Sequence, residues 1–334
     1  MASSTTIRRG FLRLALGAVF SLLCGALHPA TAAPAATQVW FNMTAYKDPA
    51  GRASWETLFF RPDAPWPEFM NHVQVVQLLT QQLIALRDDE LAQIAKKLNE
   101  HHIALSIGML AQAYDKPAHC GQNVEGYFAP EQTAVWALKL KKSGANLKYL
   151  SMDEPLWFGH YYNGPHACHT SIERVAELVA ENVRAYKKQY PDVTIGEGIP
   201  VPGLTNQPNW QADLKHWLQA FNTATGQPLA FIQLDIDWQR PNWEQGVKAF
   251  SSFARSMNIP LGIIYNAPPP GGSAMTNEQW LQGAKRNFLH IENDLRVVPD
   301  QAVFASWARY PPHSVSDPSG LGEDWLVKQY AQRK

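Results

Sequence analysis

The stretch "LKYLSMDEPLWFGHYYNG", residues 147–164, places two adjacent acids, Asp153 and Glu154, directly after a short apolar run. Pro155 follows at once, and several aromatic and histidine side chains come after it. A buried carboxylate costs free energy unless it is paired, so a strand has no structural need to end in two of them. Carboxyl groups of this kind are typical of sites that perform acid–base chemistry.

Further acids lie at the ends of two later apolar runs. Glu197 stands between two glycines in "VTIGEGI", and Asp235 and Asp237 lie in "LAFIQLDID". Charged residues make up only 17% of the chain, yet five acids gather in three such segments. Asp235 and Asp237 have the same strand parity, so we expect one face to hold both. One of them could be catalytic, while the other could bind a hydroxyl or pair with Arg240.

Aromatic residues accompany these acids. Aromatic rings stack on the apolar faces of sugar rings, and carboxylates bind sugar hydroxyls, although packing is the ordinary role of any single ring. The polar groups that follow the seventh apolar run could also bind a sugar or polarise a nucleophile. The expected substrate-binding residues are Trp157, Tyr162, Trp238, Tyr265, Asn266 and Trp307.

Eight short apolar runs alternate with amphipathic segments, which is the pattern of strands covered on both faces by helices. The runs span residues 38–45, 73–79, 103–110, 147–152, 193–199, 229–237, 260–267 and 302–308. The clearest helical patterns span residues 88–102, 170–190 and 243–258. We expect Asp88 or Asp89 to cap the first of these helices, and Thr170 and Glu173 have the spacing of a capping box.

This rhythm predicts a (β/α)8 TIM barrel over residues 38–334, as a single domain in which catalytic groups follow the strands at their C-terminal ends. An open doubly wound sheet is the rival fold. That fold normally carries a glycine-rich phosphate turn after its first strand, and "NMTAYKDPAGRASW" has none.

Residues 1–32 have the layout of a secretory signal peptide: a basic start, an apolar stretch and a small-x-small ending at Ala30-Thr31-Ala32. The pair Arg8-Arg9 resembles a twin-arginine signal, and a general secretory signal fits nearly as well. Removal of this segment takes away 3 of the 29 basic residues and no acids, so the mature charge is 26 − 29 = −3. We therefore expect an exported, periplasmic or extracellular monomer with no membrane span and no nucleic-acid partner, since no Lys/Arg cluster appears.

Two cysteines, Cys120 and Cys168, remain after residue 32. Both lie in loops expected at the same end of the barrel, and an even count in an exported protein indicates a disulfide. Zinc bound by these cysteines and nearby histidines is the alternative, although the spacing matches no known zinc pattern. The sequence predicts no metal site and no cofactor.

On these residues the chain resembles TIM-barrel glycoside hydrolases. In many retaining members the general acid is a Glu after strand four in an "NEP" turn, and here "MDEP" puts Asp153 in the place of the Asn. The adjacent acids are similar to those of hexosaminidases that use substrate-assisted catalysis. In those enzymes the Glu protonates the leaving oxygen, and the Asp orients the 2-acetamido group of the substrate. Trp307 matches a common sugar platform.

The resemblance implies a secreted glycosidase with a carbohydrate substrate, with Glu154 as general acid and Asp153, Glu197, Asp235 or Asp237 as the second group. The chain departs from the "NEP" families after strand seven, where it has Tyr265-Asn266 instead of the nucleophilic Glu. Two other functions compete. A catalytically inactive barrel could bind sugar during extracellular polysaccharide handling. A metal-dependent hydrolase is disfavoured, because the first strand lacks the His-x-His of such barrels.

Overall fold

Eight parallel strands close into a barrel in which each strand pairs with its neighbours in the sequence and the first pairs with the last. The computed structural model describes residues 36–43, 49–267, 275–306, 310–316 and 320–333. The strands are β1 (Gln38–Asn42), β2 (Val75–Leu79), β3 (Ala104–Met109), β4 (Leu147–Met152), β5 (Thr194–Val201), β6 (Ile232–Ile236), β7 (Leu261–Tyr265) and β8 (Gln301–Phe304). Each of the eight predicted runs overlaps one of them, although β5 ends two residues after the predicted run and β8 begins one residue before it. The predicted signal peptide, residues 1–32, lies outside the described residues.

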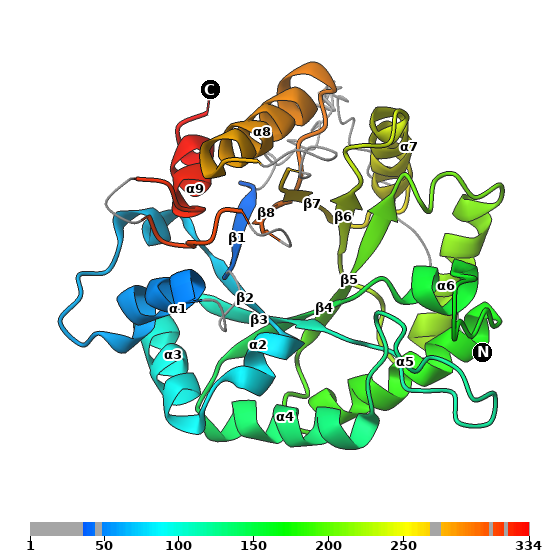
Figure 1. Cartoon of the computed structure of the whole chain (residues 1–334). Coiled ribbons are helices and arrows are strands. Elements are labelled where there is room, and N and C mark those ends of the chain that lie inside the picture. The colour runs from blue at the N-terminus through cyan, green and yellow to red at the C-terminus, as the bar shows by residue number, and fades with distance from the viewer. Residues whose placement is uncertain (1–35, 44–48, 268–274, 307–309, 317–319, 334) are drawn as a thin grey trace, which may run out of the picture. The chain divides into compact units, whose positions relative to one another are not determined.

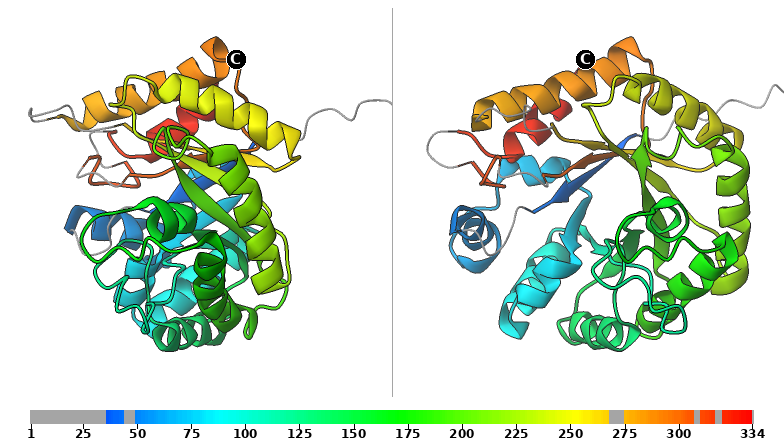
Figure 2. Two further views of the ribbon diagram at one scale, coloured as in Figure 1. Left: turned by 90° about the vertical axis from the view of Figure 1, so that its right-hand side faces the viewer. Right: turned by 45° about the vertical axis from the view of Figure 1, so that its right-hand side comes forward.

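Helices surround the ring of strands (Figures 1 and 2). They are α1 (Pro49–Trp55), α2 (Thr80–Ala85), α3 (Asp88–Glu100), α4 (Pro130–Lys142), α5 (Ile172–Lys187), α6 (Trp210–Thr225), α7 (Trp243–Ser256), α8 (Asn277–Leu289) and α9 (Asp324–Ala331). Short helical turns lie at Glu56–Phe60, Glu68–His72, Trp157–Tyr161 and His290–Asp294. The predicted (β/α)8 barrel is therefore confirmed. Within the described ranges, no helix is long and apolar enough to cross a bilayer.

Two predicted helix caps are wrong. The cap of α5 is Ser171, whose Oγ accepts a hydrogen bond from the Arg174 N–H at 3.2 Å. Thr170 is held in the preceding loop, where its own N–H donates to the Gly159 carbonyl at 3.0 Å. Helix α3 begins at Asp88 itself, so neither Asp88 nor Asp89 precedes it as a cap. Both corrections move a boundary by one residue and leave the helices in place.

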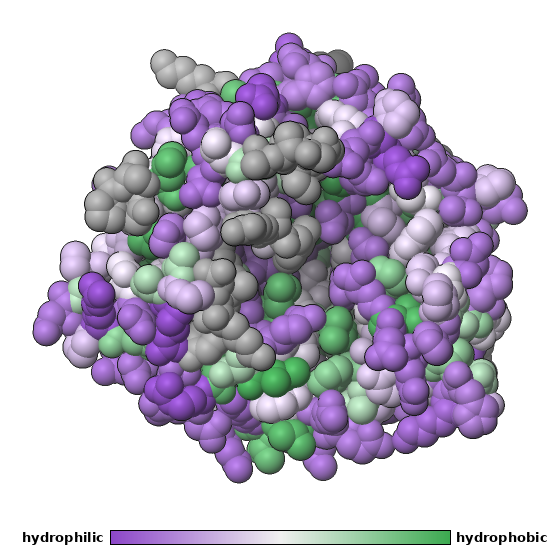
Figure 3. All heavy atoms as spheres, viewed as in Figure 1, coloured by the Kyte–Doolittle hydropathy of each residue, from purple (hydrophilic) through white to green (hydrophobic). Residues whose placement is uncertain are grey.

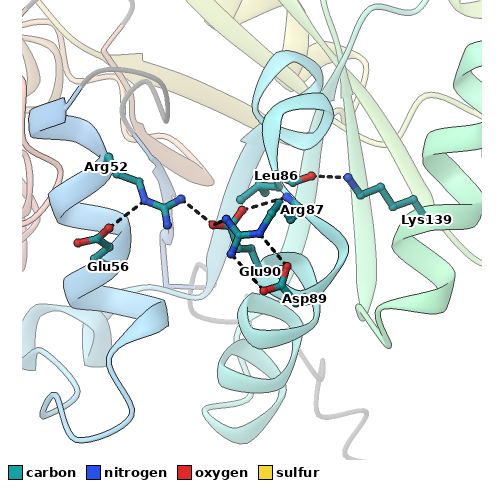
Figure 4. Close-up of polar contacts among 7 residues, drawn as sticks. All are labelled: Arg52, Glu56, Leu86, Arg87, Asp89, Glu90 and Lys139. Carbon is teal, nitrogen blue, oxygen red and sulfur yellow. Dashed lines mark hydrogen bonds and ion pairs between the residues drawn. The ribbon is translucent and has the colours of Figure 1, made fainter.

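A buried acid in the helical layer shows how this chain neutralises a structural carboxylate (Figure 4). Glu90 of α3 has only 1% of its side chain exposed, and its Oε1 lies 2.7 Å from Nη1 of Arg52 and 2.7 Å from Nη1 of Arg87. The Arg87 backbone N–H also donates to Glu90 Oε2 at 2.9 Å. This network joins α1 to α3, and Lys139 of α4 donates to the Leu86 carbonyl beside it.

Aromatic residues fill the N-terminal half of the barrel interior. The rings of Trp40, Tyr149 and Phe231 meet there, with centroids 4.9 Å apart for Trp40 and Tyr149 and 5.4 Å apart for Trp40 and Phe231. Gly196 of β5 makes room for this packing, since a Cβ at that position would lie 2.3 Å from the Phe231 ring. These rings therefore fill the barrel interior at its N-terminal end.

The face seen in Figure 3 is mostly hydrophilic. Apolar side chains gather on it over α2 and α4, where Ile84, Val135 and Leu138 are exposed.

Candidate active site

A cavity of about 280 Å³ opens at the C-terminal ends of the strands. Ligand pockets usually span about 300–1,000 Å³, so this one suits a small group such as a single sugar residue. Polar and acidic side chains from β2, β4 and β6, and from the segments that follow β2, β3 and β4, share its wall with a few aliphatic groups. The lining residues are Gln77, Leu79, Gln81, Gly108, Leu110, Glu125, Ser151, Met152, Asp153, Glu154, Gly198, Gln233, Asp235 and Ile264.

The backbone after β4 turns so that both adjacent acids reach this cavity. Asp153 keeps the strand pairing, because its N–H donates to the Met109 carbonyl at 3.0 Å. Glu154 then adopts φ +45°, in the left-handed region that costs a residue with a Cβ about 1–2 kcal/mol. In a regular strand the two side chains would point to opposite faces. The turn at Glu154 brings Asp153 and Glu154 to the same cavity.

Burial and crowding of like charges hold protons on these carboxyls. Burial is the main cause that raises the pKa of Asp153 to about 7, and the charges of Glu125 and Asp235 add to it. The pKa of Glu154 lies well above its ordinary value, because of burial first and then the charges of Asp235 and Asp153. An acid that stays protonated near neutral pH can donate a proton to a leaving group.

Asp235 of β6 lines the same cavity, whereas Asp237 does not. The expectation that one strand face holds both acids is wrong, because β6 ends at Ile236 and the chain turns at Asp237. The Asp237 carboxylate accepts hydrogen bonds from the Gln239 N–H and from Nε of Arg240, both at 3.2 Å. Asp237 is therefore an exposed turn residue in an ion pair.

Glu197 faces away from the cavity. The glycines on either side of it point into the barrel, where Gly196 accommodates Phe231 and Gly198 borders the cavity. The alternation of the strand therefore turns Glu197 toward the helices, where both of its oxygens lie 2.9 Å from Nε1 of Trp217 in α6. Burial raises the pKa of Glu197 to about 8, and the Trp217 hydrogen bond opposes this rise.

The two residues predicted after strand seven also lie away from the cavity. Ile264 is the inward residue, so Tyr265 points outward and donates from its hydroxyl to Oε1 of Glu292 at 2.9 Å. Asn266 Oδ1 accepts from Nε1 of Trp238 at 2.6 Å, which links the loops that follow β6 and β7. These contacts make Tyr265 a core residue and give Asn266 and Trp238 a structural link.

The remaining predicted aromatics belong to loops at the same end of the barrel. Trp157 packs against Tyr161 with ring centroids 6.1 Å apart, and Tyr162 packs edge-on against Phe158 at 5.8 Å. Both are half-buried, and neither lines the cavity. Trp307 lies outside the described residues.

The predicted disulfide between Cys120 and Cys168 is present, with Cα atoms 5.1 Å apart. It joins the loop after β3 to the loop after β4, and the Gly121 N–H donates to the His166 carbonyl at 2.9 Å beside it. Within the described part of the chain, no three His, Cys, Asp or Glu side chains are grouped to hold a metal ion.

Sequence reasoning missed Glu125 and the polar floor of the cavity. Glu125 comes from the long loop between β3 and α4, where no periodicity indicates direction. Next to it Gly126 has φ +83°, and a Cβ there would lie 2.9 Å from the Asp153 carbonyl oxygen. The loop thus approaches Asp153 closely and places Glu125 at the cavity. A signal did exist for Gln77 and Gln233, because each is a polar residue inside a mostly apolar run.

No protein-family model and no curated protein matches the sequence. Solved structures match over most of its length. A GH10 structure from Paenibacillus barcinonensis aligns with a TM-score of 0.53 at 10% identity, covering 89% of this chain and 96% of that one. A GH10 endoxylanase from a sugarcane soil metagenome gives 0.53 at 9% identity, with 89% and 97% covered. An endo-β-1,4-mannanase variant from Cellulomonas fimi gives 0.51 at 11% identity, with 88% and 69% covered.

This chain shares the fold of barrel glycosidases. At identities this low, the structural alignments establish the (β/α)8 architecture alone. The function must be argued from the site itself.

Proposed function

We propose that this protein is an exported glycoside hydrolase in which Glu154 is the general acid. The observation that supports it best is the position of Glu154: a left-handed turn after β4 aims its carboxyl into a cavity where burial, Asp235 and Asp153 raise its pKa well above the ordinary value. A protonated carboxyl so placed can protonate the oxygen of a glycosidic bond as that bond breaks.

Asp235 is the best candidate for the second carboxylate. Most glycosidases use a pair of carboxyl groups on either side of the scissile bond. Asp235 of β6 shares the cavity with Glu154, while Glu197 contacts Trp217 in the helical layer and Asp237 pairs with Arg240. We assign to Asp153, which lines the same cavity beside Glu154, the role of orienting the substrate.

Sugar release by residues 33–334 from a panel of bacterial and plant glycans, N-acetylated ones included, tests the proposal. Glu154→Gln should lower the rate by about a hundredfold or more, the usual contribution of a general acid. Asp237→Asn is the matched control, since it removes a carboxylate at the same barrel end but outside the cavity, and it should keep the activity.

The outcome also separates the competing roles. Activity confined to N-acetylated glycans would favour Asp153 as the orienter of an acetamido group. Activity on unacetylated glycans would favour Asp235 as nucleophile or base. Sugar binding without release, unchanged in Glu154→Gln, would overturn the enzyme and support an inactive sugar-binding barrel.

A further inference from the structure

Gln77 presents a hydrogen-bond donor to the floor of the cavity. Its side chain has only 4% of its surface exposed and lines the cavity from β2. Nδ2 of Asn42 on β1 donates to Gln77 Oε1 at 3.1 Å, which fixes the orientation of the amide. Nε2 of Gln77 forms no hydrogen bond to another described residue. Because Gln77 lines the cavity, this unused N–H group can donate to a ligand there.

Gly108 leaves open space beside this donor. It stands on β3 between β2 and β4, in register with Leu79 and Ser151. A Cβ at residue 108 would lie 2.8 Å from Cδ2 of Leu79 and 3.8 Å from Nε2 of Gln77. The missing side chain therefore opens a gap at the edge of the Gln77 amide, and glycine inside a strand often marks such a close approach.

Ser151 of β4 supplies an acceptor on the other side of the gap. Its hydroxyl donates to Oε1 of Gln233 at 2.9 Å, and Nε2 of Gln233 donates to Oε1 of Gln301 at 2.8 Å. The Ser151 hydrogen is thus used within the floor, and lone pairs of Oγ remain. A hydroxyl carries one donor and two acceptor sites.

We infer that Gln77, Gly108 and Ser151 form a subsite that binds a hydroxyl-bearing edge of one neutral sugar ring. Gln77 Nε2 donates to a sugar hydroxyl oxygen, and that hydroxyl or its neighbour donates to Ser151 Oγ. The inference rests on the proposed function and names the part of the substrate that enters the barrel. An ammonium group fits less well, because it has no lone pair to accept from Gln77.

This arrangement makes Gln77 a residue that determines specificity. A site built to hydrogen-bond a substrate hydroxyl discriminates against an analogue that lacks it, because the buried protein group is then left unpaired. Asp153 and Glu154 come two and three residues after Ser151, just past the end of β4 at Met152. A ring held at the floor therefore lies next to the two carboxyl groups at the mouth.

Binding of D-glucose, D-galactose, D-mannose and D-xylose to residues 33–334, measured by NMR titration, tests the subsite. The sugar that binds is then compared with its monodeoxy analogues in the wild type and in Gln77→Leu. One deoxy analogue should bind the wild type about three- to tenfold more weakly than its parent, as expected for one hydrogen bond. The same analogue should bind Gln77→Leu as well as the parent does.

Gln77→Met guards against a folding artefact, since it keeps the length of the side chain and adds no charge but offers no N–H to the cavity. Both variants should raise KM on a hydrolysed glycan more than they lower kcat. Equal losses for every deoxy analogue in wild type and variants, or no binding of any of the four sugars, would overturn the inference even if a glycan is hydrolysed. A preference for the parent sugar over one deoxy analogue that is lost in Gln77→Leu, together with no hydrolysis of any glycan, would instead support the subsite and overturn the proposed enzyme.

Discussion

At the scale of single residues, Glu154 depends on a backbone conformation that its sequence does not signal. The pattern "LKYLSMDEP" indicated a strand that ends in two acids, and alternation alone would have sent only one of them to the cavity. The left-handed φ of Glu154 is uncommon for a residue with a Cβ, and such outliers cluster at functional sites. The position of Glu154 at the cavity could be predicted from sequence, whereas the joint placement of Asp153 could not.

The pH dependence of hydrolysis should report the charge of Asp153. Because Asp153 is among the groups that raise the pKa of Glu154, Asp153→Asn should let Glu154 lose its proton at a lower pH. The basic limb of kcat/KM should therefore move toward acid, whatever happens to the maximal rate. Glu125→Gln is the control, and its shift should be smaller because Glu125 is a weaker contributor. An unmoved basic limb in Asp153→Asn would contradict the assignment of this limb to Glu154.

Glu197 should affect stability rather than chemistry. Its pKa is raised from 4.5 to about 8 in the folded protein, so its contribution to folding is fully present below pH 4.5 and is lost as the pH rises to 8. Glu197→Gln removes this titration, and Gln still accepts from Trp217. The free energy of unfolding of the variant relative to wild type should rise by a few kcal/mol from pH 4.5 to 9, since one pKa unit is worth about 1.4 kcal/mol.

Urea unfolding at several pH values between 4.5 and 9 measures this difference. If the buried amide of the variant has a fixed cost, it lowers the free energy of unfolding equally at every pH. The change of the difference between variant and wild type with pH is then unaffected. Parallel stability curves for the two proteins would show that Glu197 does not titrate with a raised pKa.

At the scale of elements, strands and helices were predictable and their last residues were not. Short apolar runs and amphipathic segments located all eight strands. The error at Asp237 arose because "LAFIQLDID" continues the alternation one residue beyond the end of β6, where the chain turns toward Arg240. The prediction that Tyr265 binds substrate was wrong for a related reason. An apolar run buried on both faces does not reveal which of its residues point into the barrel. The position of Glu125 at the cavity could not be predicted, because it depends on the path of the loop between β3 and α4.

The Cys120–Cys168 disulfide should hold the loop that carries Glu125. It spans a sequence separation of 48 residues, and the chain-entropy estimate for such a loop is about 4 kcal/mol. The double variant Cys120→Ser/Cys168→Ser should unfold at a lower urea concentration and should raise KM, because the loop at the cavity rim loses its tie to the loop after β4.

Reduction of the wild-type protein should reproduce both effects, and reductant should not change the variant. A variant as stable as wild type would contradict the bracing role. A loss of stability with an unchanged KM would separate the disulfide from the cavity.

At the scale of the whole molecule, the barrel sets where chemistry can occur. Aromatic packing around Trp40 closes the interior at one end, and polar residues of β2, β4 and β6 form a floor below the carboxyl groups at the other. Length and strand rhythm were enough to predict this architecture from sequence. The substrate was not predictable, because a (β/α)8 barrel hosts many reactions and the solved structures of the same fold share only about a tenth of their residues with this chain.

The central claim is that Glu154 donates a proton to the leaving group, and its most direct test is the dependence of rate on leaving-group acidity. Aryl glycosides of the sugar identified in the glycan panel supply the series, from dinitrophenyl to phenyl, and the wild type is compared with Glu154→Gln. A good leaving group needs no proton, so the variant should cleave the dinitrophenyl glycoside at a rate near that of wild type. It should lose about a hundredfold or more on the phenyl glycoside. An equal loss across the whole series would contradict the role of Glu154 as general acid.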